Sequence, residues 1–358
     1  MSVIITGTGS YIPSSVTSND EFKDHRFFNE DGEQLSEKNE VIIRKFKAIT
    51  GISERRYIKP HKVTSDIATF AANRAIADAG IDPETLDYIV IAHNYGDVPN
   101  GHHQSDTVPS LASRVKHQLK IKNPRCVAYD ILFGCPGWVE ATIHCNAFIK
   151  GGMAKKCLVI GAEALSRVVD QHDRDSMIYS DGAGAVILEL KPEEETGAEN
   201  QGILHHLTAT YALDEAHFIY FGPSYNQEEN SARNYIKMYG RKIYEFAITR
   251  VPQAMKQCME DAGQDIKDLK KVFIHQANEK MDEAILHRFY KLYDMPAPAD
   301  IMPLTINTLG NSSVATVPTL YDLVRRGELE GHKVSPGDLV MFASVGAGMN
   351  VNAILYRV

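Results

Sequence analysis

The chain lacks the features that mark disulfide-stapled, zinc-binding or membrane-spanning proteins. Its five cysteines are an odd number and form no CxxC pair, which argues against a disulfide framework or a zinc ribbon. No stretch approaches the ~20 apolar residues of a membrane span. The N-terminus has no basic start and only a short apolar run, unlike a secretory leader. We therefore expect a cytoplasmic protein with reduced thiols.

Positive charge is also scarce. Lysine and arginine number 38 against 46 acidic residues, so the net charge is −8. This balance argues against a nucleic-acid-binding protein, which would carry basic stripes. The histidine pairs His102-His103 and His205-His206 have no carboxylate or cysteine at metal-binding spacing, so no metal site is expected.

What the chain does contain is an internal duplication. Residues 70–93 and 251–275 each read as a helix with apolar periodicity, an Asp-Ala-Gly, a polar turn and a short apolar strand that ends in histidine. Gly80 and Gly263 fall where a helix ends in the left-handed conformation. Candidate helices at 134–150 and 310–326, each followed by an apolar strand, extend the parallel; these strands are 157–162 and 338–344.

Strands that are apolar throughout and alternate with helices predict an α/β protein with parallel sheets covered on both faces. We interpret the chain as two similar βαβαβ halves, residues 1–190 and 203–358, joined by the charged stretch 191–202. The alternative is a chance likeness between two α/β units, since such units share composition. The polar residues 23–40 are predicted to form a surface excursion.

The duplication places Cys135 and Asn311 at matching helix starts. A thiol at a helix N-terminus is expected to have a lowered pKa because the helix dipole favours thiolate. Pro136 suits the first helical position. The alternative for Cys135 is a buried structural thiol, which is the role we expect for the remaining cysteines, Cys126, Cys145, Cys157 and Cys258.

His275 ends a predicted strand, and the carboxyl ends of strands are where open α/β sheets place ligands. His93 holds the corresponding point of the first half. The two histidines therefore offer a comparison in which one is catalytic and the other merely polar.

With these motifs in order, the sequence resembles the β-ketoacyl-acyl-carrier-protein synthase III type ketosynthases of the thiolase superfamily. The likeness runs along nearly the whole chain and includes Thr50-Gly-Ile-Ser-Glu-Arg-Arg56, Ser180-Asp-Gly-Ala-Gly-Ala185, His275-Gln-Ala-Asn278 and Gly310-Asn-Ser-Ser313. The resemblance implies a thiolase-like fold whose halves pack as an α-β-α-β-α sandwich. It also implies a homodimer.

The resemblance further implies a decarboxylative condensation that initiates fatty-acid synthesis. Cys135 would take an acyl primer as a thioester, while His275 and Asn311 would hold the carbonyl of a malonyl thioester whose decarboxylation gives an enolate. The backbone N–H groups of Cys135 and Ala347 would form a second oxyanion hole. The implied partners are acyl-CoA and acyl carrier protein, with no cofactor beyond these thioesters.

Other positions carry over as substrate or carrier contacts. The resemblance assigns Arg167 to the adenine of coenzyme A and places Gly240 and Asn278 among the substrate-binding residues. Lys280 and Arg288 would dock the carrier protein, although Glu245 replaces the lysine usual on the docking helix.

Departures from the family pattern concern the primer. Lys45 and Ile49 stand where a tryptophan and an arginine usually contact coenzyme A, and 96–103 is an insertion. Val108 replaces the phenylalanine by which the partner subunit often closes the acyl pocket. A smaller side chain there would admit primers longer than acetyl.

Several alternatives remain open at this point. A ketosynthase of a specialised lipid or aromatic-polyketide pathway would share the same residues. A 3-hydroxy-3-methylglutaryl-CoA synthase is disfavoured by the pairing of His275 with Asn311. A cysteine hydrolase would need no duplicated frame, and a non-catalytic partner subunit would be expected to have lost Cys135.

Overall fold

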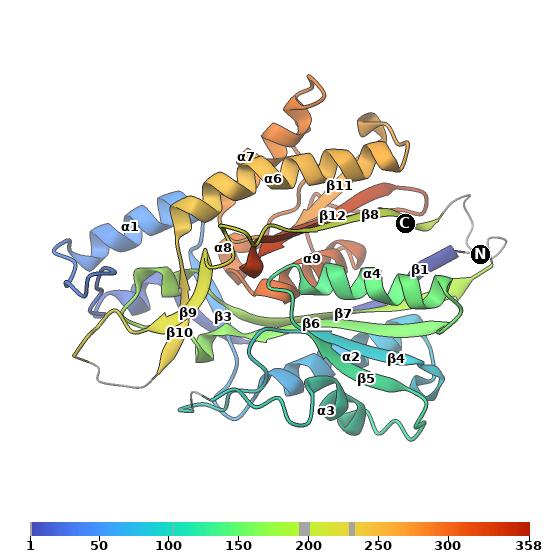
Figure 1. Ribbon diagram of the computed structural model, residues 1–358, viewed down its shortest axis with the longest axis horizontal. Helices are drawn as coiled ribbons and strands as arrows, with labels where there is room; N and C mark the ends of the chain where they lie inside the picture. The colour runs from blue at the N-terminus through green and yellow to red at the C-terminus, as the bar shows by residue number, and fades with distance from the viewer. Residues whose placement is uncertain (1, 103, 193–200, 229–232) are drawn as a thin grey trace.

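Two β-sheets form the frame of the molecule, and three layers of helices separate and cover them (Figure 1). The computed structural model describes residues 2–102, 104–192, 201–228 and 233–358. Helices α2 and α3 cover the outside of the first sheet, and α6 and α7 cover the outside of the second (Figure 1). Helices α4 and α9 lie between the sheets. This is the layered thiolase-like sandwich that the resemblance implied.

The first sheet and its helices comprise β1 (Ser2–Tyr11), α2 (Thr64–Ala79), β4 (Tyr88–Ala92), α3 (Leu111–Gln118), β5 (Val127–Ile131), α4 (Gly137–Lys150), β6 (Lys156–Ala164) and β7 (Asp181–Lys191). The second comprises β8 (Gly202–Thr210), α6 (Gly240–Asp261), β11 (Leu269–Ile274), α7 (Glu279–Lys291), α9 (Thr316–Arg325), β12 (Leu339–Gly346) and β13 (Asn350–Arg357).

Strand order is repeated between the sheets. The first runs β1-β7-β6-β4-β5 and the second, read from its other end, runs β8-β13-β12-β11. The second sheet has one strand fewer among the described residues. The second sheet has no described strand that corresponds to β5. Beside β11, the N–H of Val272 instead donates to the carbonyl of Ile301 at 2.9 Å, so an irregular segment takes that place.

The prediction of parallel sheets is wrong, because both sheets are mixed. β4 pairs in parallel with β5 and β6, and β11 with β12. In each sheet, the strand that comes last in the sequence runs in the opposite direction to both of its neighbours. This strand is β7 in the first sheet and β13 in the second. These strands are buried on both faces, so their apolar pattern carries no information about direction.

The division of the chain into halves 1–190 and 203–358 stays a prediction, although the strands of the two sheets come from residues 2–191 and 202–357. Most of the predicted connection at 191–202 lies outside the described residues. The predicted left-handed helix ends are confirmed, since φ is +64° at Gly80 and +63° at Gly263.

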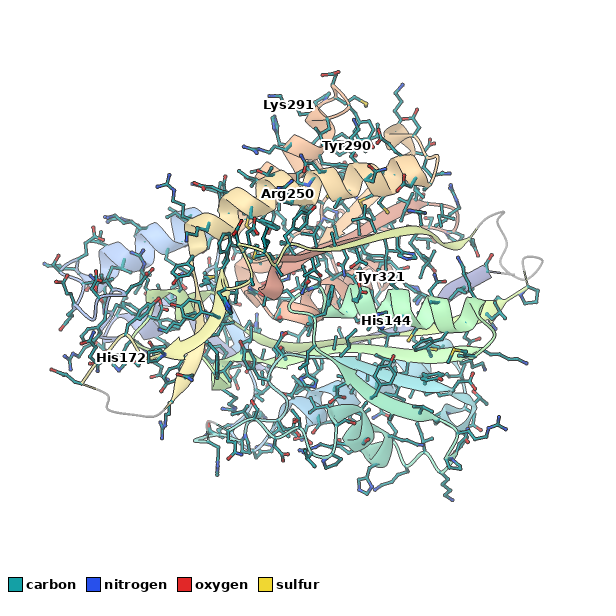
Figure 2. All side chains as sticks on the ribbon, in the orientation of Figure 1. His144, His172, Arg250, Tyr290, Lys291 and Tyr321 are labelled. Carbon is teal, nitrogen blue, oxygen red and sulfur yellow. The ribbon has the colours of Figure 1, made fainter. Side chains whose placement is uncertain are left out.

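The layer between the sheets is rich in aromatic side chains. Tyr321 of α9 (Figure 2) packs edge-on against Phe273 and Phe342, with ring centroids 5.2 and 5.1 Å apart. The single tryptophan, Trp138, is fully buried in α4 and also contacts Phe342 edge-on. Burial of these rings fixes how the two sheets sit against α4 and α9.

A smaller lobe covers one end of the sandwich. It contains β2 (Ser15–Ser18), α1 (Asn39–Thr50), β3 (Glu54–Tyr57), β9 (Ile219–Pro223), β10 (Asn234–Met238) and α8 (Ile306–Leu309). Residues 23–40 lie here and are mainly exposed, as predicted. However, Phe27 and Phe28 are buried, and Phe27 packs in a cluster with Phe46 and Met177. The excursion is therefore anchored to the fold. Within the described residues, no helix has the length and apolar character needed to cross a membrane.

Candidate active site

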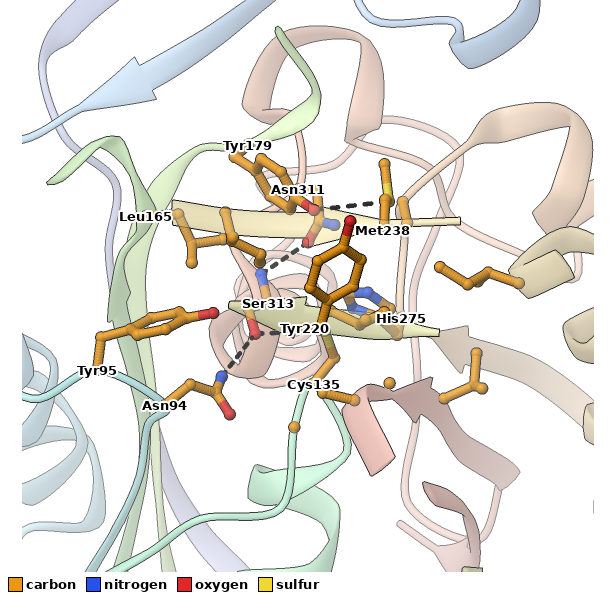
Figure 3. A pocket seen from close by; sticks show the side chains of 18 of the residues that line it. Asn94, Tyr95, Cys135, Leu165, Tyr179, Tyr220, Met238, His275, Asn311 and Ser313 are labelled. Carbon is orange, nitrogen blue, oxygen red and sulfur yellow. Dashed lines mark hydrogen bonds between the residues drawn. The ribbon is translucent and has the colours of Figure 1, made fainter. Parts of the chain in front are cut away.

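Three side chains from different parts of the chain meet at one cavity between the sandwich and the lobe. Cys135, His275 and Asn311 all line this cavity, whose volume is ≈ 250 Å³ (Figure 3). His93 does not join them. Its Nε2 lies 3.0 Å from the Asp130 carboxylate and its Nδ1 accepts from the N–H of Gly96 at 3.0 Å. Of the two matched histidines, only His275 reaches the cavity.

Cys135 lies just before a helix rather than inside it. Helix α4 begins at Gly137 with Pro136 as its N-cap, so the helix predicted over 134–150 starts three residues later than expected and Pro136 is not the first helical residue. The loop is held close to the second sheet. A Cβ at Gly346 would lie 2.5 Å from the nitrogen of Cys135, which only glycine avoids.

The expectation of a lowered thiol pKa is wrong. Burial raises the pKa of Cys135 to about 11, and the negative charge of Glu163 adds to the rise. A hydrogen bond from Ser313 Oγ to Cys135 Sγ at 3.3 Å acts in the opposite direction. The thiol is therefore the resting form near neutral pH, and attack requires a group that takes its proton.

His275 is held rigidly at the end of β11. Its N–H donates to the carbonyl of Ala343 in β12 at 2.9 Å, and the residue is only 3% exposed. Burial lowers the pKa of His275 to about 4, opposed by a hydrogen bond with the backbone of Ser313. The imidazole is consequently neutral near pH 7, so it can donate one proton and accept another.

Asn311 does not begin a helix as predicted. It lies between α8 and a short 3-10 turn, Ser313–Ala315, and α9 begins at Thr316. Its N–H donates to Ile178 at 3.0 Å, and its carbonyl accepts from Ser180 at 2.8 Å. The side-chain Oδ1 accepts from the N–H of Ser313 at 2.8 Å, which turns the amide NH₂ toward the cavity.

The rest of the cavity wall is mainly apolar and aromatic. Its side chains come from segments beside the strands of the first sheet, from β12 and α7, and from the β9–β10 hairpin. They include Tyr95, Leu165, Tyr179, Ile219, Phe221, Ile236, Met238, Met281 and Val345. A wall of this kind favours an acyl chain over a polar substrate, while the few polar groups converge around Cys135.

Comparisons with known proteins identify relatives over nearly the whole chain. Models of the 3-oxoacyl-[acyl-carrier-protein] synthase III family match residues 129–205 and, for its C-terminal part, 259–358. The β-ketoacyl-[acyl-carrier-protein] synthase III of Erythrobacter litoralis is 32% identical over 356 residues, which cover 99% of this chain and 98% of the relative. The chain belongs to the 3-oxoacyl-[acyl-carrier-protein] synthase III family. It is therefore an acyltransferase of the condensing type.

Further relatives extend the match over the whole length. The synthase III of Novosphingobium aromaticivorans is 33% identical over 358 residues, covering 99% of this chain and 98% of that protein. The crystal structure of 3-oxoacyl-[acyl-carrier-protein] synthase III from Aquifex aeolicus VF5 superposes with a TM-score of 0.79 at 29% identity. That comparison covers 99% of this chain and 100% of the other.

A second cavity of ≈ 480 Å³ adjoins the first in this synthase III family member and shares Asn311, Ala277 and Met281 with it. Gly240 and Asn278 line it, as do Lys45 and Ile49, the positions at which the sequence departs from the family pattern. Asn278 also caps α7, because its Oδ1 accepts from the N–H of Met281 at 3.1 Å. The second cavity leads toward the lobe surface beside α1 and α6.

Arg167 is not brought to either cavity. Its guanidinium donates to Asn100 Oδ1 at 2.6 Å and to the carbonyl of Lys59 at 3.1 Å. Arg174 lines the second cavity instead. No spacing in the sequence singled out Arg174, because it follows an acidic, loop-like stretch and comes near α1 only in the folded chain.

Of the remaining residues predicted to contact substrate or carrier, one lines the first cavity and three are exposed on the surface. Ala347 lines the first cavity, and a Cβ at Gly134 would lie 2.6 Å from its nitrogen. Val108 is 84% exposed and does not line the cavity of its own chain, so its role in a partner's pocket stays a prediction. Lys280 and Arg288 are exposed on α7, and Arg288 donates to the carbonyl of Ile248 at 3.2 Å.

Metal ligands are not clustered in the parts of the chain that the structure describes: no group of three or more His, Cys, Asp or Glu is placed to hold an ion. His205 and His206 stack with ring centroids 6.0 Å apart on β8. Of the other predicted pair, His103 lies outside the described residues.

Sequence analysis also missed Gln276, which links the two loops of the site. Its Nε2 donates to the carbonyl of Pro303 at 2.8 Å, and its Oε1 accepts from the N–H of Thr305 at 2.9 Å. These bonds tie the loop after His275 to the segment that leads into α8 and Asn311. The signal was present, since Gln276 directly follows the histidine in a recognised motif, but its partners are distant in sequence.

Glu163 in β6 provides a pH-dependent prediction. Burial raises its pKa from an ordinary value of 4.5 to about 7. The folded state therefore favours the protonated Glu163 carboxyl. The stability that this carboxyl contributes is fully present below about pH 4.5 and is lost as the pH rises through about 7. Because a glutamine at this position does not ionise, we expect the stability of Glu163→Gln relative to the wild type to increase by roughly 3 kcal/mol as the pH rises from the lower limit to the upper one.

Thermal unfolding of both proteins at about pH 5 and about pH 8 measures this difference. Glu228→Gln is a suitable control because Glu228 is exposed on the lobe, where its side chain is 78% accessible. A stability difference between Glu163→Gln and wild type that stays constant with pH would contradict the prediction.

Proposed function

We propose that the chain condenses an acyl thioester primer with a malonyl thioester, with loss of CO₂, to give a 3-oxoacyl thioester at the start of fatty-acid synthesis. The observation that carries this proposal is the convergence of Cys135, His275 and Asn311 on one apolar cavity. Family membership supports the reaction type. The acyl–cysteine intermediate and the residue roles are part of the proposal.

In the first step, Cys135 Sγ attacks the primer carbonyl and loses its proton, which neutral His275 accepts. The C–S bond to the primer's carrier breaks, and the proton returns to the leaving thiolate. The loops that carry the N–H groups of Cys135 and Ala347 approach each other closely at Gly134 and Gly346, and these two N–H groups would stabilise the oxyanion. The product of this step is an acyl thioester on Cys135.

In the second step, the malonyl thioester binds with its carbonyl oxygen between His275 and Asn311. Loss of CO₂ leaves an enolate, and both side chains are neutral donors aimed at the oxygen on which charge develops. The enolate carbon attacks the acyl thioester, the bond to Cys135 breaks, and the sulfur takes up a proton. Two donors that act only on the developing charge accelerate the chemical step itself.

The test is to incubate the purified chain with acyl-CoA primers of increasing length and malonyl-acyl carrier protein. Intact-protein mass spectrometry then detects the acyl adduct, and the 3-oxoacyl product is measured together with CO₂. An adduct without CO₂ release would favour a non-decarboxylating condensation, and free acid as the sole product would indicate a hydrolase. Either outcome would overturn the proposed function.

We further propose that acyl carrier protein and acyl-CoA are the partners and that no cofactor beyond these thioesters takes part in the cytoplasmic reaction. Lys280 lies exposed beside Asn278, which lines the second cavity, and Arg241 is 91% accessible at the start of α6. A phosphate-bearing carrier arm would meet positive charge at this entrance. Glu245 pairs with Arg241 at 3.0 Å and partly offsets that charge.

A homodimer is expected, because β5 is the open edge of the first sheet. Val127 at the start of β5, Leu132 just after it, and Val108 are 46%, 66% and 84% exposed. An unpaired edge strand flanked by exposed apolar residues favours pairing with a second copy. Sedimentation should give a species of twice the 39.8 kDa chain mass, and a stable monomer at micromolar concentration would contradict the prediction.

A further inference from the structure

A line of buried hydrogen bonds runs behind the nucleophile and is not used by the chemistry described above. Ser313 Oγ lies 3.3 Å from Cys135 Sγ, and Asn94 Nδ2 lies 3.3 Å from the same Ser313 oxygen (Figure 3). Asn94 Nδ2 is also 2.7 Å from Glu163 Oε2. The line therefore joins a carboxylate in β6 to the thiol that precedes α4.

The direction of each hydrogen bond follows from the chemistry of the groups. The Asn94 Nδ2 carries two N–H groups and accepts nothing, so it donates one of them to Glu163 whether or not the carboxyl is ionised. Its second N–H points to Ser313 Oγ, which must accept. The single hydroxyl proton of Ser313 is then left to donate to Cys135 Sγ, where it favours the thiolate.

Each member of the line is held in place. Glu163 is 1% exposed, and its Oε2 also accepts from the backbone N–H of Asn94 at 2.9 Å. Ser313 has a positive φ of +53°, and its N–H is occupied by Asn311 Oδ1. The side chains are therefore fixed by their own backbones as well as by one another, which leaves little freedom for the hydroxyl to turn.

Glu163 is costly to keep in this position. Its Oε1 is buried without a hydrogen-bond partner among the described residues, and removing such an oxygen from water is unfavourable. The groups that face the carboxylate are His93, Asn94 and Tyr95 after β4, and Cys135 beyond them. Only Asn94 hydrogen-bonds it directly among these side chains.

We propose that Glu163 and Asn94 are positioning residues that keep the Ser313 hydroxyl pointed at Cys135 and thereby set the acidity of the nucleophile. The inference rests on the proposed function only in taking Cys135 as the reacting thiol. Glu163 and Asn94 touch no reacting atom, so their effect on the reaction passes through Ser313.

The test is the pH dependence of Cys135 alkylation by iodoacetamide in the full chain, followed from about pH 6 to about pH 11. Below the midpoint the alkylation rate is proportional to the thiolate fraction, so a rise of the midpoint by one unit is measured as a rate about tenfold lower at the same pH. Ser313→Ala removes the donor, and we expect the midpoint to rise by about one pH unit or more. Asn94→Ala frees the hydroxyl to turn away and should raise the midpoint by a smaller amount. Ser312→Ala is the matched control, because Ser312 Oγ bonds Thr316 Oγ1 at 3.3 Å and not the thiol.

A pair of Glu163 variants separates orientation from charge. Glu163→Gln keeps an oxygen that accepts from Asn94 and removes a negative charge near the thiol, so the midpoint should stay or fall. Glu163→Leu removes the acceptor, so the midpoint should rise toward that of Asn94→Ala. Circular dichroism of each variant shows whether it is folded, and the Asn94 and Ser313 variants decide the matter if Glu163→Leu does not fold.

An unchanged midpoint in both Ser313→Ala and Asn94→Ala would overturn the proposal. So would a rise in Glu163→Gln equal to that in Asn94→Ala, since charge or packing would then be responsible. Alkylation needs no substrate, so this result is independent of the proposed function. Absence of an acyl adduct on the wild-type protein would count against that function and would not affect the inference about the line of hydrogen bonds.

Discussion

Replacing Cys135 with alanine is expected to abolish formation of the acyl adduct and to lower condensation from acyl-CoA by at least ~10³-fold, as when other covalent nucleophiles are removed. The four remaining cysteines are buried, whereas Cys135 is partly accessible at the cavity. They therefore offer no substitute thiol. Intact-mass analysis and peptide mapping after incubation with acyl-CoA measure the adduct directly.

The prediction has a sharper second part. Decarboxylation of the malonyl thioester depends on the donors His275 and Asn311 and not on the sulfur, so CO₂ release should continue in Cys135→Ala. Cys126→Ala is the matched control, because Cys126 is buried and does not line the cavity. Adduct formation that persists at the wild-type rate in Cys135→Ala would refute the assignment of the nucleophile.

Replacing Asn311 with alanine is expected to give the opposite pattern. The amide NH₂ that Ser313 turns toward the cavity is lost, and one missing donor to a developing oxyanion typically costs ~10²–10³-fold in rate. Condensation and CO₂ release should fall together by that factor. Acylation of Cys135 should proceed at a rate close to that of the wild type, since the proposed oxyanion hole for that step uses backbone N–H groups.

Asn307→Ala provides the control for this variant. Asn307 lies on α8 only four positions earlier in the chain, and its side chain is exposed. Rapid-quench measurement of adduct formation, alongside CO₂ release, separates the two steps. If Asn311→Ala slowed acylation as much as decarboxylation, the division of roles between the two oxyanion sites would be wrong.

The sequence predicted which residues meet at one cavity better than it predicted the directions of the strands. Cys135, His275 and Asn311 each follow a segment whose apolar pattern is clear, and the structure brings all three to one cavity. Helix ends at Gly80 and Gly263 were also predictable, because a local rule of backbone conformation governs them. Strand direction was not predictable for β7 and β13, because a strand buried on both faces looks the same in either direction.

Properties that depend on tertiary surroundings were out of reach. The pKa of Cys135 rises because the folded chain buries the sulfur, which no local pattern in the sequence reveals. Glu163 and Ser313 are 150 positions apart, and no spacing rule links them to each other or to Asn94. Arg174 was missed for the same reason, since its relation to α1 exists only in the folded lobe.

The backbone bonds of Asn311 to Ile178 and Ser180 have a thermodynamic consequence. They join the segment that leads into α9, in the layer between the sheets, to the residues just before β7 of the first sheet. A fluctuation that lifts the Asn311 segment from the residues before β7 breaks these bonds and withdraws Asn311 from Cys135. Forms of the protein that have lost this contact would then carry no residual activity, so a local opening between these two segments is enough to stop catalysis.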